Sequence, residues 1–403
     1  MQQKSIWGIV SISSIPLVMT LGNSMLIPVL PTIEKELGIS SLQVSLLITV
    51  YSIVAILCIP VAGYLSDHIG RKQVIIPSLL LAAAGGALAG LAAWKFDSPY
   101  YWLIAGRLLQ GVGAAGAAPI AFPLVGDLFT TEKEVSAGLG LVETSNTFGK
   151  VISPILGALL ASFVWFLPFF SFPIFCLISI VMLLVFVKLP KRKDKPKKFK
   201  AFVKMIRETF KREGRWLSIV FFIGGLSMYL IFGLLFYLST SLEKEYGIHG
   251  VKKGVVLAFP LAALCLSSYV TGKLIGQDKM KMKWYTVGGL ALLTLSILWI
   301  SLSEDIYVLL TALFSAGLGI GAALPSLDAF VTEGIDQEQR GSITSLYSSM
   351  RFVGVALGPP VFAALMNFNH FMIFFSHAIF CALSLLLTLV MIKPEKPVKS
   401  TWS

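Results

Sequence analysis

The stretch Gly63-Tyr-Leu-Ser-Asp67-His-Ile-Gly70-Arg71-Lys72 forms a short polar turn between two apolar stretches, residues 47–65 and 74–94. Its two glycines let helix ends approach closely and let the backbone reverse direction. Asp67 can face the positive N-terminus of a neighbouring helix, while Arg71 and Lys72 can hold the turn on the cytoplasmic side of a membrane. So charged a hairpin in a hydrophobic chain indicates that the turn itself has a role.

The composition independently indicates a membrane protein. Of the 403 residues, 56% are hydrophobic and 13% are charged, whereas a soluble domain carries roughly 25% charged residues. The mean hydropathy is +0.82. Twelve apolar stretches reach the length of about 20 residues that a membrane span requires, and the first is too long for a removable signal peptide. We expect these spans at residues 6–31, 43–65, 73–95, 100–128, 134–163, 165–189, 216–242, 252–275, 284–303, 306–333, 340–367 and 370–393.

The distribution of basic residues predicts the orientation in the membrane. With the N-terminus inside, cytoplasmic segments hold 25 of the 33 Lys and Arg residues and outside loops hold 5. This bias predicts a multi-pass protein of the cytoplasmic membrane with both termini in the cytoplasm. Residues 188–215 contain 13 basic and 3 acidic residues and explain most of the net charge of +12. We interpret them as an anchor on anionic membrane lipids, with a short amphipathic helix at Phe199–Phe210, and not as a nucleic-acid site.

Similar motifs occur in both halves of the chain. The glycines of Gly113 and Gly319, and the Gly-Pro elements at Gly149 and Gly354, are separated by 206 and 205 residues. A constant offset indicates a duplicated six-span unit, whose interface would hold a site at mid-membrane depth. The predicted fold is an all-α membrane protein of twelve transmembrane helices in two pseudo-symmetric six-helix bundles. Its parts would be an N-terminal bundle, a basic cytoplasmic linker and a C-terminal bundle, at residues 1–189, 190–215 and 216–403.

Four motifs resemble those of a known transporter family. The polar turn resembles the signature turn of the major facilitator superfamily. Leu21-Gly22-Asn-Ser-Met-Leu-Ile-Pro28 resembles the first-span motif of its twelve-span drug:proton antiporters, and Arg107-Leu-Leu-Gln110-Gly111-Val-Gly113 resembles their fourth-span motif. The antiporter motif of span five is similar to Gly149-Lys-Val-Ile-Ser153-Pro154-Ile-Leu-Gly157, although Ser153 replaces a glycine. The resemblance implies a two-lobed transporter that works by alternating access and exports its substrate in exchange for protons.

Charged residues inside the predicted spans are functional candidates, because burying a charge in a bilayer costs at least about 2.5 kcal/mol. By resemblance, Arg107 takes part in proton coupling; the alternative is a structural tie to backbone carbonyls at an unwound helix end. Glu143, Asn146, Thr147 and Lys150 follow helical spacing and share one face of span five. Glu143 is the leading proton site, since a carboxylate that loses water when the cavity closes can take up a proton. The alternative is a permanent ion pair with Lys150 or Arg351.

Two further groups of residues are functional candidates. The predicted substrate cavity is lined by Asn23, Asn146, Lys150, Tyr229, Phe236 and Arg351. A conformational gate at the cytoplasmic edge, part of which is implied by the resemblance, comprises Gly63, Asp67, Gly70, Arg71, Lys72, Asp127 and Asp328. Arg107, Lys150 and Arg351 are three cations against one deep carboxylate, Glu143, and such a cavity favours anions over lipophilic cations.

The sequence therefore predicts a transporter and no enzyme. It contains no nucleotide-binding loop, and its cysteines and histidines show no metal-ligand spacing. We expect no cofactor, with a proton gradient as the energy source, and a monomer whose partners are protons, lipids and a small-molecule substrate. The motifs favour multidrug efflux of amphiphilic compounds. The alternative is a dedicated exporter of an anionic metabolite, such as a siderophore or a sugar derivative, or a lipid-headgroup flippase. An uncoupled facilitator or a receptor is a weaker third class.

Overall fold

The computed structural model describes residues 3–129, 132–187, 199–276, 278–335 and 337–392. These residues are almost entirely helical. The helices are α1 (Gln3–Ser24), η1 (Ile27–Val29), α2 (Leu30–Leu37), α3 (Ser41–Ile69), α4 (Arg71–Lys95), α5 (Tyr100–Leu128), α6 (Glu132–Phe163), α7 (Leu167–Phe186), α8 (Phe199–Lys244), α9 (Gly250–Ile275), α10 (Lys279–Ser301), α11 (Ile306–Gly334), α12 (Gln337–Leu365) and α13 (His370–Met391). Twelve spans in this part of the chain are long and apolar enough to cross a membrane. The predicted all-helical, twelve-span fold is confirmed.

Most of the polar turn is helical, and a single residue of it connects two helices. Helix α3 ends at Ile69 and α4 begins at Arg71, so that Gly70 alone reverses the chain. Its φ of 108° lies in a region that side chains with a Cβ atom rarely adopt, which explains the glycine. On the other side of α3, Ser40 and Gln43 form a capping box that begins the helix.

The first span is broken, whereas the sequence predicted one continuous stretch at residues 6–31. Helix α1 ends at Ser24, and the short helices η1 and α2 follow it. Pro28 and Pro31 stand within the first two positions of these two helices, where the missing N–H groups do no harm. The break leaves carbonyl groups near Gly22 for bonds to side chains of other helices.

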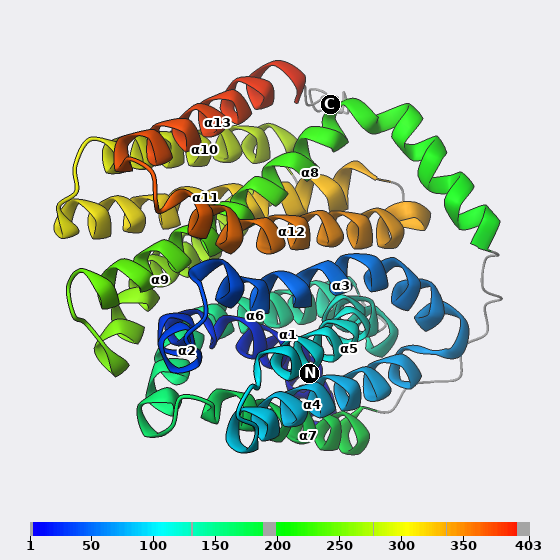
Figure 1. Cartoon of the computed structure of the whole chain (residues 1–403). Coiled ribbons are helices and arrows are strands. Elements are labelled where there is room, and N and C mark those ends of the chain that lie inside the picture. The colour runs from blue at the N-terminus through cyan, green and yellow to red at the C-terminus, as the bar shows by residue number, and fades with distance from the viewer. Residues whose placement is uncertain (1–2, 130–131, 188–198, 277, 336, 393–403) are drawn as a thin grey trace.

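The seventh span is longer than predicted. Helix α8 begins at Phe199, inside the predicted basic linker, of which residues 190–198 lie outside the described residues. The rings of Phe210 and Phe221 lie 5.7 Å apart, although eleven residues of a straight helix span about 16 Å. The helix therefore bends sharply between Phe210 and Phe221, and Figure 1 shows the bend in α8. The predicted amphipathic segment folds back against the C-terminal half, where Thr209 bonds Gln339 at 2.7 Å.

The two halves meet along two helix pairs. Helix α3 packs against α12, and α6 packs against α9; the first pair lies side by side at the boundary in Figure 1. These are spans two with eleven and five with eight, so exchanging the halves converts one pair into the other. Such a pair of contacts is the geometry expected of two repeats around a central site.

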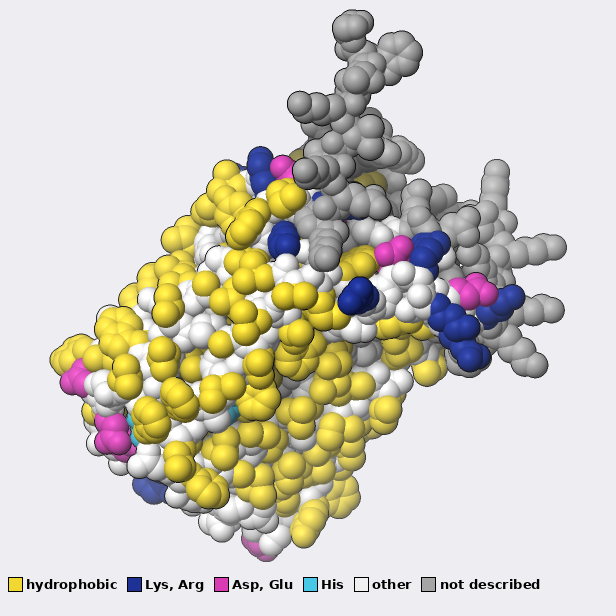
Figure 2. All heavy atoms as spheres, turned by 90° about the horizontal axis from the view of Figure 1, so that it is seen from above, with side chains coloured by type: hydrophobic (Ala, Val, Ile, Leu, Met, Phe, Trp, Pro, Cys, Tyr) yellow, Lys and Arg dark blue, Asp and Glu magenta, His cyan; other side chains and the backbone are white. Residues whose placement is uncertain are grey.

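The outer surface is apolar enough to face lipid. Leu57, Leu266 and Val390 expose 69%, 60% and 65% of their surface, together with many other large apolar side chains. Figure 2 shows that hydrophobic side chains cover the middle of the visible face, while charged side chains gather toward its ends. Monomeric soluble proteins rarely expose so large an apolar area. The protein is a multi-pass membrane protein.

We name the two ends of the bundle by their residues. The basic end carries Gly70 and the described part of the basic linker, and the opposite end carries Gly38 and Asn369. At the opposite end Lys244 of α8 donates to Glu34 of α2 at 2.6 Å and to Ser41 of α3 at 3.4 Å. Ser239 of α8 donates to the carbonyl of Ile27 at 3.0 Å. These residues form the opposite-end latch, which ties the two halves together.

Replacing Lys244 by methionine should loosen the opposite-end latch. The ion pair is partly exposed, so it contributes at most about 1 kcal/mol, equivalent to a population change of about fivefold. We expect longer and broader distances between spin labels at Glu36→Cys and Lys252→Cys, measured by pulsed electron resonance in a background without native cysteines. Lys35→Met, on the exposed side of α2, serves as the control. An unchanged distance distribution in both Lys244→Met and Glu34→Gln would contradict the latch.

Candidate functional site

Helix α6 presents the polar face that the sequence predicts. Glu143, Asn146 and Lys150 are half-buried, at depths where the surrounding helices are apolar. Thr20 of α1 donates to Asn146 at 2.6 Å, which turns the amide group of Asn146 toward the Glu143 carboxylate at 3.4 Å. The fourth residue, Thr147, donates to the backbone carbonyl of Glu143 and takes no further part.

Two charged residues of the C-terminal half face these groups. Arg351 of α12 lies 3.3 Å from Asp328 of α11, and its guanidinium group is 5.8 Å from the centre of the Tyr347 ring. Both Asp328 and Arg351 interact electrostatically with Glu143 and Lys150 of α6. Glu143, Lys150, Asp328 and Arg351 therefore form one central charge cluster between the two halves.

The charge balance of this cluster differs from the sequence prediction. Asp328 was predicted at the cytoplasmic gate, but the structure pairs it with Arg351 within reach of Glu143. Arg107 was counted among the cavity cations, but it lies elsewhere in the N-terminal half. The cluster therefore contains two cations and two carboxylates, whereas the sequence predicted three cations and one carboxylate. The distant placement of Asp328 in the sequence, near the end of a long span, hid this proximity.

Lys150 differs from the other members of the cluster. In the part of the chain that the structure describes, no hydrogen bond or ion pair joins its ammonium group, although Glu143 and Asp328 are electrostatic neighbours. Arg351, by contrast, is paired with Asp328. Because an ammonium group at this depth gains strongly from an anionic partner, Lys150 is the group in the cluster most ready to bind one.

Arg107 is fully buried and holds the broken first span in place. It donates to the backbone carbonyls of Leu47 at 2.7 Å and Gly22 at 3.1 Å, and to the side chains of Gln110 and Asn23 at 2.6 and 2.5 Å. Its guanidinium group also lies 4.4 Å from the centre of the Tyr51 ring. All these partners are neutral and belong to the N-terminal half. This geometry agrees with a structural tie to an unwound helix end and brings no carboxylate of the described residues to Arg107.

Three of the predicted cavity residues lie outside the central charge cluster. Asn23 is 5% exposed and is used by Arg107. Phe236 is 1% exposed inside the C-terminal half. Tyr229 is half-buried, and its hydroxyl lies 2.6 Å from Nε2 of His377. In this state the structure brings together Asn146, Lys150 and Arg351 of the predicted lining, and leaves the other three apart.

The gate residues of the polar turn bind one another within the N-terminal half. Arg71 pairs with Asp67 at 2.6 Å and with Asp127 of α5 at 3.3 Å, which joins three helices at the basic end. Lys72 donates to the carbonyl of Val187 at the end of α7. Gly63 faces the hydroxyl of Ser345 on α12, at a distance that leaves room for only ordinary contact. Their role as a gate stays a prediction.

The antiporter motif on α6 serves close helix packing. A Cβ atom on Gly157 would clash with the carbonyl oxygen of Met25, and a Cβ atom on Gly254 of α9 would lie 2.5 Å from the carbonyl oxygen of Pro154. Ser153 donates to the carbonyl of Gly149. The motif therefore brings α6 against the break in the first span and against the other half, which positions the polar face of α6.

Sequence reasoning missed two tyrosine–histidine pairs. Tyr229 bonds His377, and Tyr237 lies 3.2 Å from Nδ1 of His370, so both pairs join α8 to α13. The second ring nitrogen of each histidine donates to a backbone carbonyl, so the nitrogen facing tyrosine accepts a hydrogen bond. The matching spacings, eight residues on α8 and seven on α13, were the available signal. Two of the four histidines therefore lie on one face of α13, opposite tyrosines of α8.

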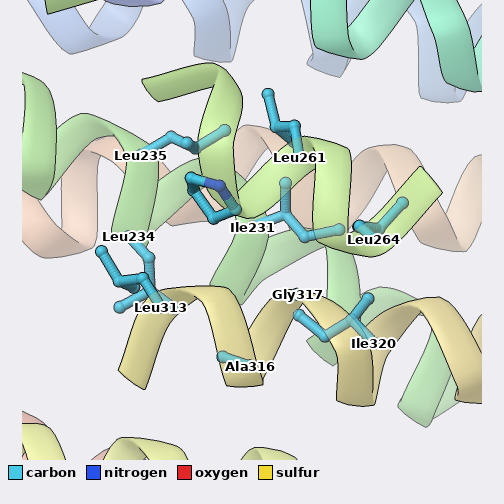
Figure 3. A pocket seen from close by; sticks show the side chains of 10 residues that line it. Ile231, Leu234, Leu235, Leu261, Leu264, Leu313, Ala316, Gly317 and Ile320 are labelled. Carbon is cyan, nitrogen blue, oxygen red and sulfur yellow. The ribbon is translucent and has the colours of Figure 1, made fainter. Parts of the chain in front are cut away.

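Two pockets in the C-terminal half are lined by none of the four residues of the central charge cluster. A pocket of about 30 Å³ between α8, α9 and α11 is lined by apolar residues such as Ile231, Leu261 and Gly317 (Figure 3). It holds at most one water-sized molecule, and its apolar lining makes it dry. A polar pocket of about 380 Å³ at the opposite end includes Glu245, Glu304 and His370. No group of three potential metal ligands occurs among the residues that the structure describes.

The profile of the Major Facilitator Superfamily matches residues 12–359. The chain belongs to this superfamily. It is 54% identical over 390 residues to the bacillibactin exporter of Bacillus subtilis (strain 168), covering 96% of this chain and 97% of that protein. Multidrug resistance protein 2 of the same organism is 26% identical and covers 91% and 90% of the two chains. The fold matches a bacterial homologue of the human lysosomal transporter Spinster with a TM-score of 0.78 and 15% identity, over 99% and 100% of the chains.

The superfamily assignment settles the general class of the protein. Members of this superfamily and the relatives described above are transporters, and the chain is a transporter and not an enzyme. The resemblance predicted from the four motifs is thereby confirmed. The relative that is more than half identical is an exporter, so small-molecule export is the class of transport that the comparisons support.

Removing the Arg107 guanidinium should destabilise the protein. Arg107→Met leaves two buried carbonyls and two buried amide oxygens without their donor, and we expect a loss of about 3 kcal/mol or more in the free energy of unfolding. Thermal unfolding in detergent measures the loss. Lys150→Met, whose parent side chain bonds no described residue, should leave the melting temperature nearly unchanged. A stable Arg107→Met protein that fails only in transport would favour the proton-coupling role instead.

Proposed function

We propose that the protein exports a siderophore of the bacillibactin type, as an anion, from the cytoplasm by alternating access. The observation that carries this proposal is the ammonium group of Lys150 inside the central charge cluster, which no described residue joins by a hydrogen bond or ion pair. Such a group at mid-membrane depth favours a substrate that brings negative charge. The bacillibactin exporter that shares 54% of its residues with this chain supports the same substrate class.

The chemistry of the substrate class matches the residues of the cluster. A ligand that binds a hard metal ion through oxygen atoms carries acidic oxygens, and these can accept hydrogen bonds from Lys150 and from the guanidinium group of Arg351. Asp328 already holds Arg351 at 3.3 Å and fixes its direction. The negative charge of Glu143 offsets the positive charge of Lys150 while no substrate is bound. The site is thereby neutral when empty and offers donors when an anion enters.

The contacts at the two ends of the bundle would provide the alternation that such export requires. The opposite-end latch of Glu34 and Lys244 would close the outside when the site faces the cytoplasm. The ion pairs of Arg71 with Asp67 and Asp127 would contribute to closing the cytoplasmic side when the site faces out. With both termini in the cytoplasm, as the basic residues predict, the basic end would collect anions from the cytoplasm before export.

The proton gradient stays the proposed energy source, with Glu143 as the candidate proton site. The electrical part of this gradient also acts on an anion directly. Moving one negative charge outward across an inside-negative membrane is favourable by about 2.3 kcal/mol per 100 mV. The monomer, with its lipids, is the proposed working unit because one chain contains both halves.

Multidrug efflux is the second candidate function. It is supported by the antiporter motifs and by the 26% identity with multidrug resistance protein 2. A lipophilic cation would then bind to Glu143. The corrected charge count of two cations and two carboxylates leaves this function open, whereas Lys150, which has no bonded partner among the described residues, argues against it.

Transport in everted membrane vesicles distinguishes the two functions. We expect energised vesicles that contain the protein to accumulate iron-free bacillibactin, because the cytoplasmic face of the transporter is then outside. Lys150→Met should reduce the initial rate at least about tenfold, since a charge-assisted hydrogen bond contributes about 1.5–3 kcal/mol. Lys252→Met, an exposed lysine at the opposite end, is the matched control.

The same vesicles test the cationic substrate. Addition of ethidium should leave an imposed proton gradient intact if the proposed function is right. Collapse of the gradient by ethidium, abolished in Glu143→Gln, together with no accumulation of bacillibactin, would establish multidrug efflux in its place.

A further inference from the structure

Two buried hydrogen bonds join the halves without using a charge. Thr49 of α3 donates its hydroxyl to the backbone carbonyl of Ala356 of α12 at 2.8 Å. Ser239 of α8 donates to the carbonyl of Ile27 in η1 at 3.0 Å. Thr49 and Ser239 are 7% and 0% exposed, so both donors are shielded from water. One bond runs from the N-terminal to the C-terminal half, and the other runs in the reverse direction.

Both acceptor carbonyls lack their usual helical donor. In an α-helix, a carbonyl accepts a hydrogen bond from the N–H of the residue four positions later. For Ala356 that residue is Pro360, which has no N–H. For Ile27 it is Pro31, which has none either. A buried carbonyl without a donor is costly. Each half therefore supplies a hydroxyl in place of the N–H group that a proline removes from the other half.

The two hydroxyls can change partners when the halves separate. A serine or threonine within a helix can donate to the carbonyl four residues before it. The Thr49 hydroxyl already lies 3.4 Å from the carbonyl of Ser45 in its own helix, and Leu235 occupies the equivalent position for Ser239. Water that enters the opened space can donate to the two freed carbonyls. Closing and opening thus exchange one set of hydrogen bonds for another, and each exchange has a small net free energy.

We propose that the bonds of Thr49 and Ser239 form a hydroxyl lock, which closes the opposite end of the bundle and opens when water replaces the hydroxyls at the two freed carbonyls. The Ser239 bond is the uncharged part of the opposite-end latch. The Thr49 bond lies deeper, because its acceptor Ala356 is five residues past Arg351 of the central charge cluster on the way to the opposite end of α12. The inference uses the alternating movement of the proposed function, but neither its substrate nor its energy source.

The rate at which a water-soluble maleimide labels Ser45→Cys tests the hydroxyl lock. Ser45 is fully buried and lies one helical turn from Thr49 on the same face of α3, so a cysteine there reacts when the opposite end opens. The native cysteines are replaced first, and the purified protein is labelled in lipid nanodiscs. Ser52→Ala and Thr240→Val are the matched controls, because they remove buried hydroxyls of α3 and α8 that bond carbonyls of their own helices.

We expect Thr49→Val and Ser239→Ala each to raise the labelling rate on the order of fivefold, since each removes a buried hydrogen bond that only the closed form makes. Ser239 lies on a different helix from the labelled cysteine, so its effect cannot be a local change at the label. The two controls should leave the rate nearly unchanged, and Thr49→Ser, which keeps the hydroxyl, should label like the parent. A rate in either test variant that does not exceed that of its control would overturn the hydroxyl lock.

Pro360→Ala tests whether the proline creates the acceptor. The new N–H can bond the carbonyl of Ala356 within α12, so Thr49→Val should change the labelling rate less in this background than in the parent. An equal change in both backgrounds would overturn the exchange at a freed carbonyl. The labelling requires no substrate. Failure of the vesicles to accumulate bacillibactin would therefore overturn the proposed function and leave the hydroxyl lock in place.

Discussion

A charge in the hydrocarbon part of a bilayer costs at least about 2.5 kcal/mol, and this constraint decides where every ion of the membrane-spanning region can lie. A charged side chain can be buried there with hydrogen-bonding partners or placed close to an opposite charge, and the structure shows both arrangements. Arg107 is buried in one half, where carbonyls and amides satisfy its donors. The charges of α6, α11 and α12 meet between the halves, where each has an opposite charge nearby.

The same constraint links the packing of the helices to the site. A polar face on α6 is tolerable only where another protein surface, or water, covers it. The small residues of the antiporter motif bring α6 against the break in the first span and against α9 of the other half. This close packing provides the cover. The glycines of α6 allow the close packing that covers its charged side chains, so the two sets of residues depend on each other.

The relatives and the charges together change the balance between the functions that the sequence left open. The motifs favour drug efflux, and the distant relatives share that role. The relative with 54% identity exports bacillibactin, and a lysine without a described partner lies in the cluster. Motifs of this kind describe how the fold packs and moves, which transporters with different substrates share, while we propose that side chains such as Lys150 recognise the substrate.

The sequence by itself determined the spans, their order and the duplication, because a length of about 20 apolar residues and a constant offset are properties of the chain alone. Span four was predicted at the bounds that α5 has in the structure, and the polar face of α6 was read from helical spacing. The tertiary structure alone decided which charges meet. Asp328 joins Arg351 and Glu143, and Arg107 turns away toward Gly22, because these distances depend on how helices tilt, break and bend against each other. Spacing along a chain fixes neighbours on one helix, and only packing fixes neighbours on different helices.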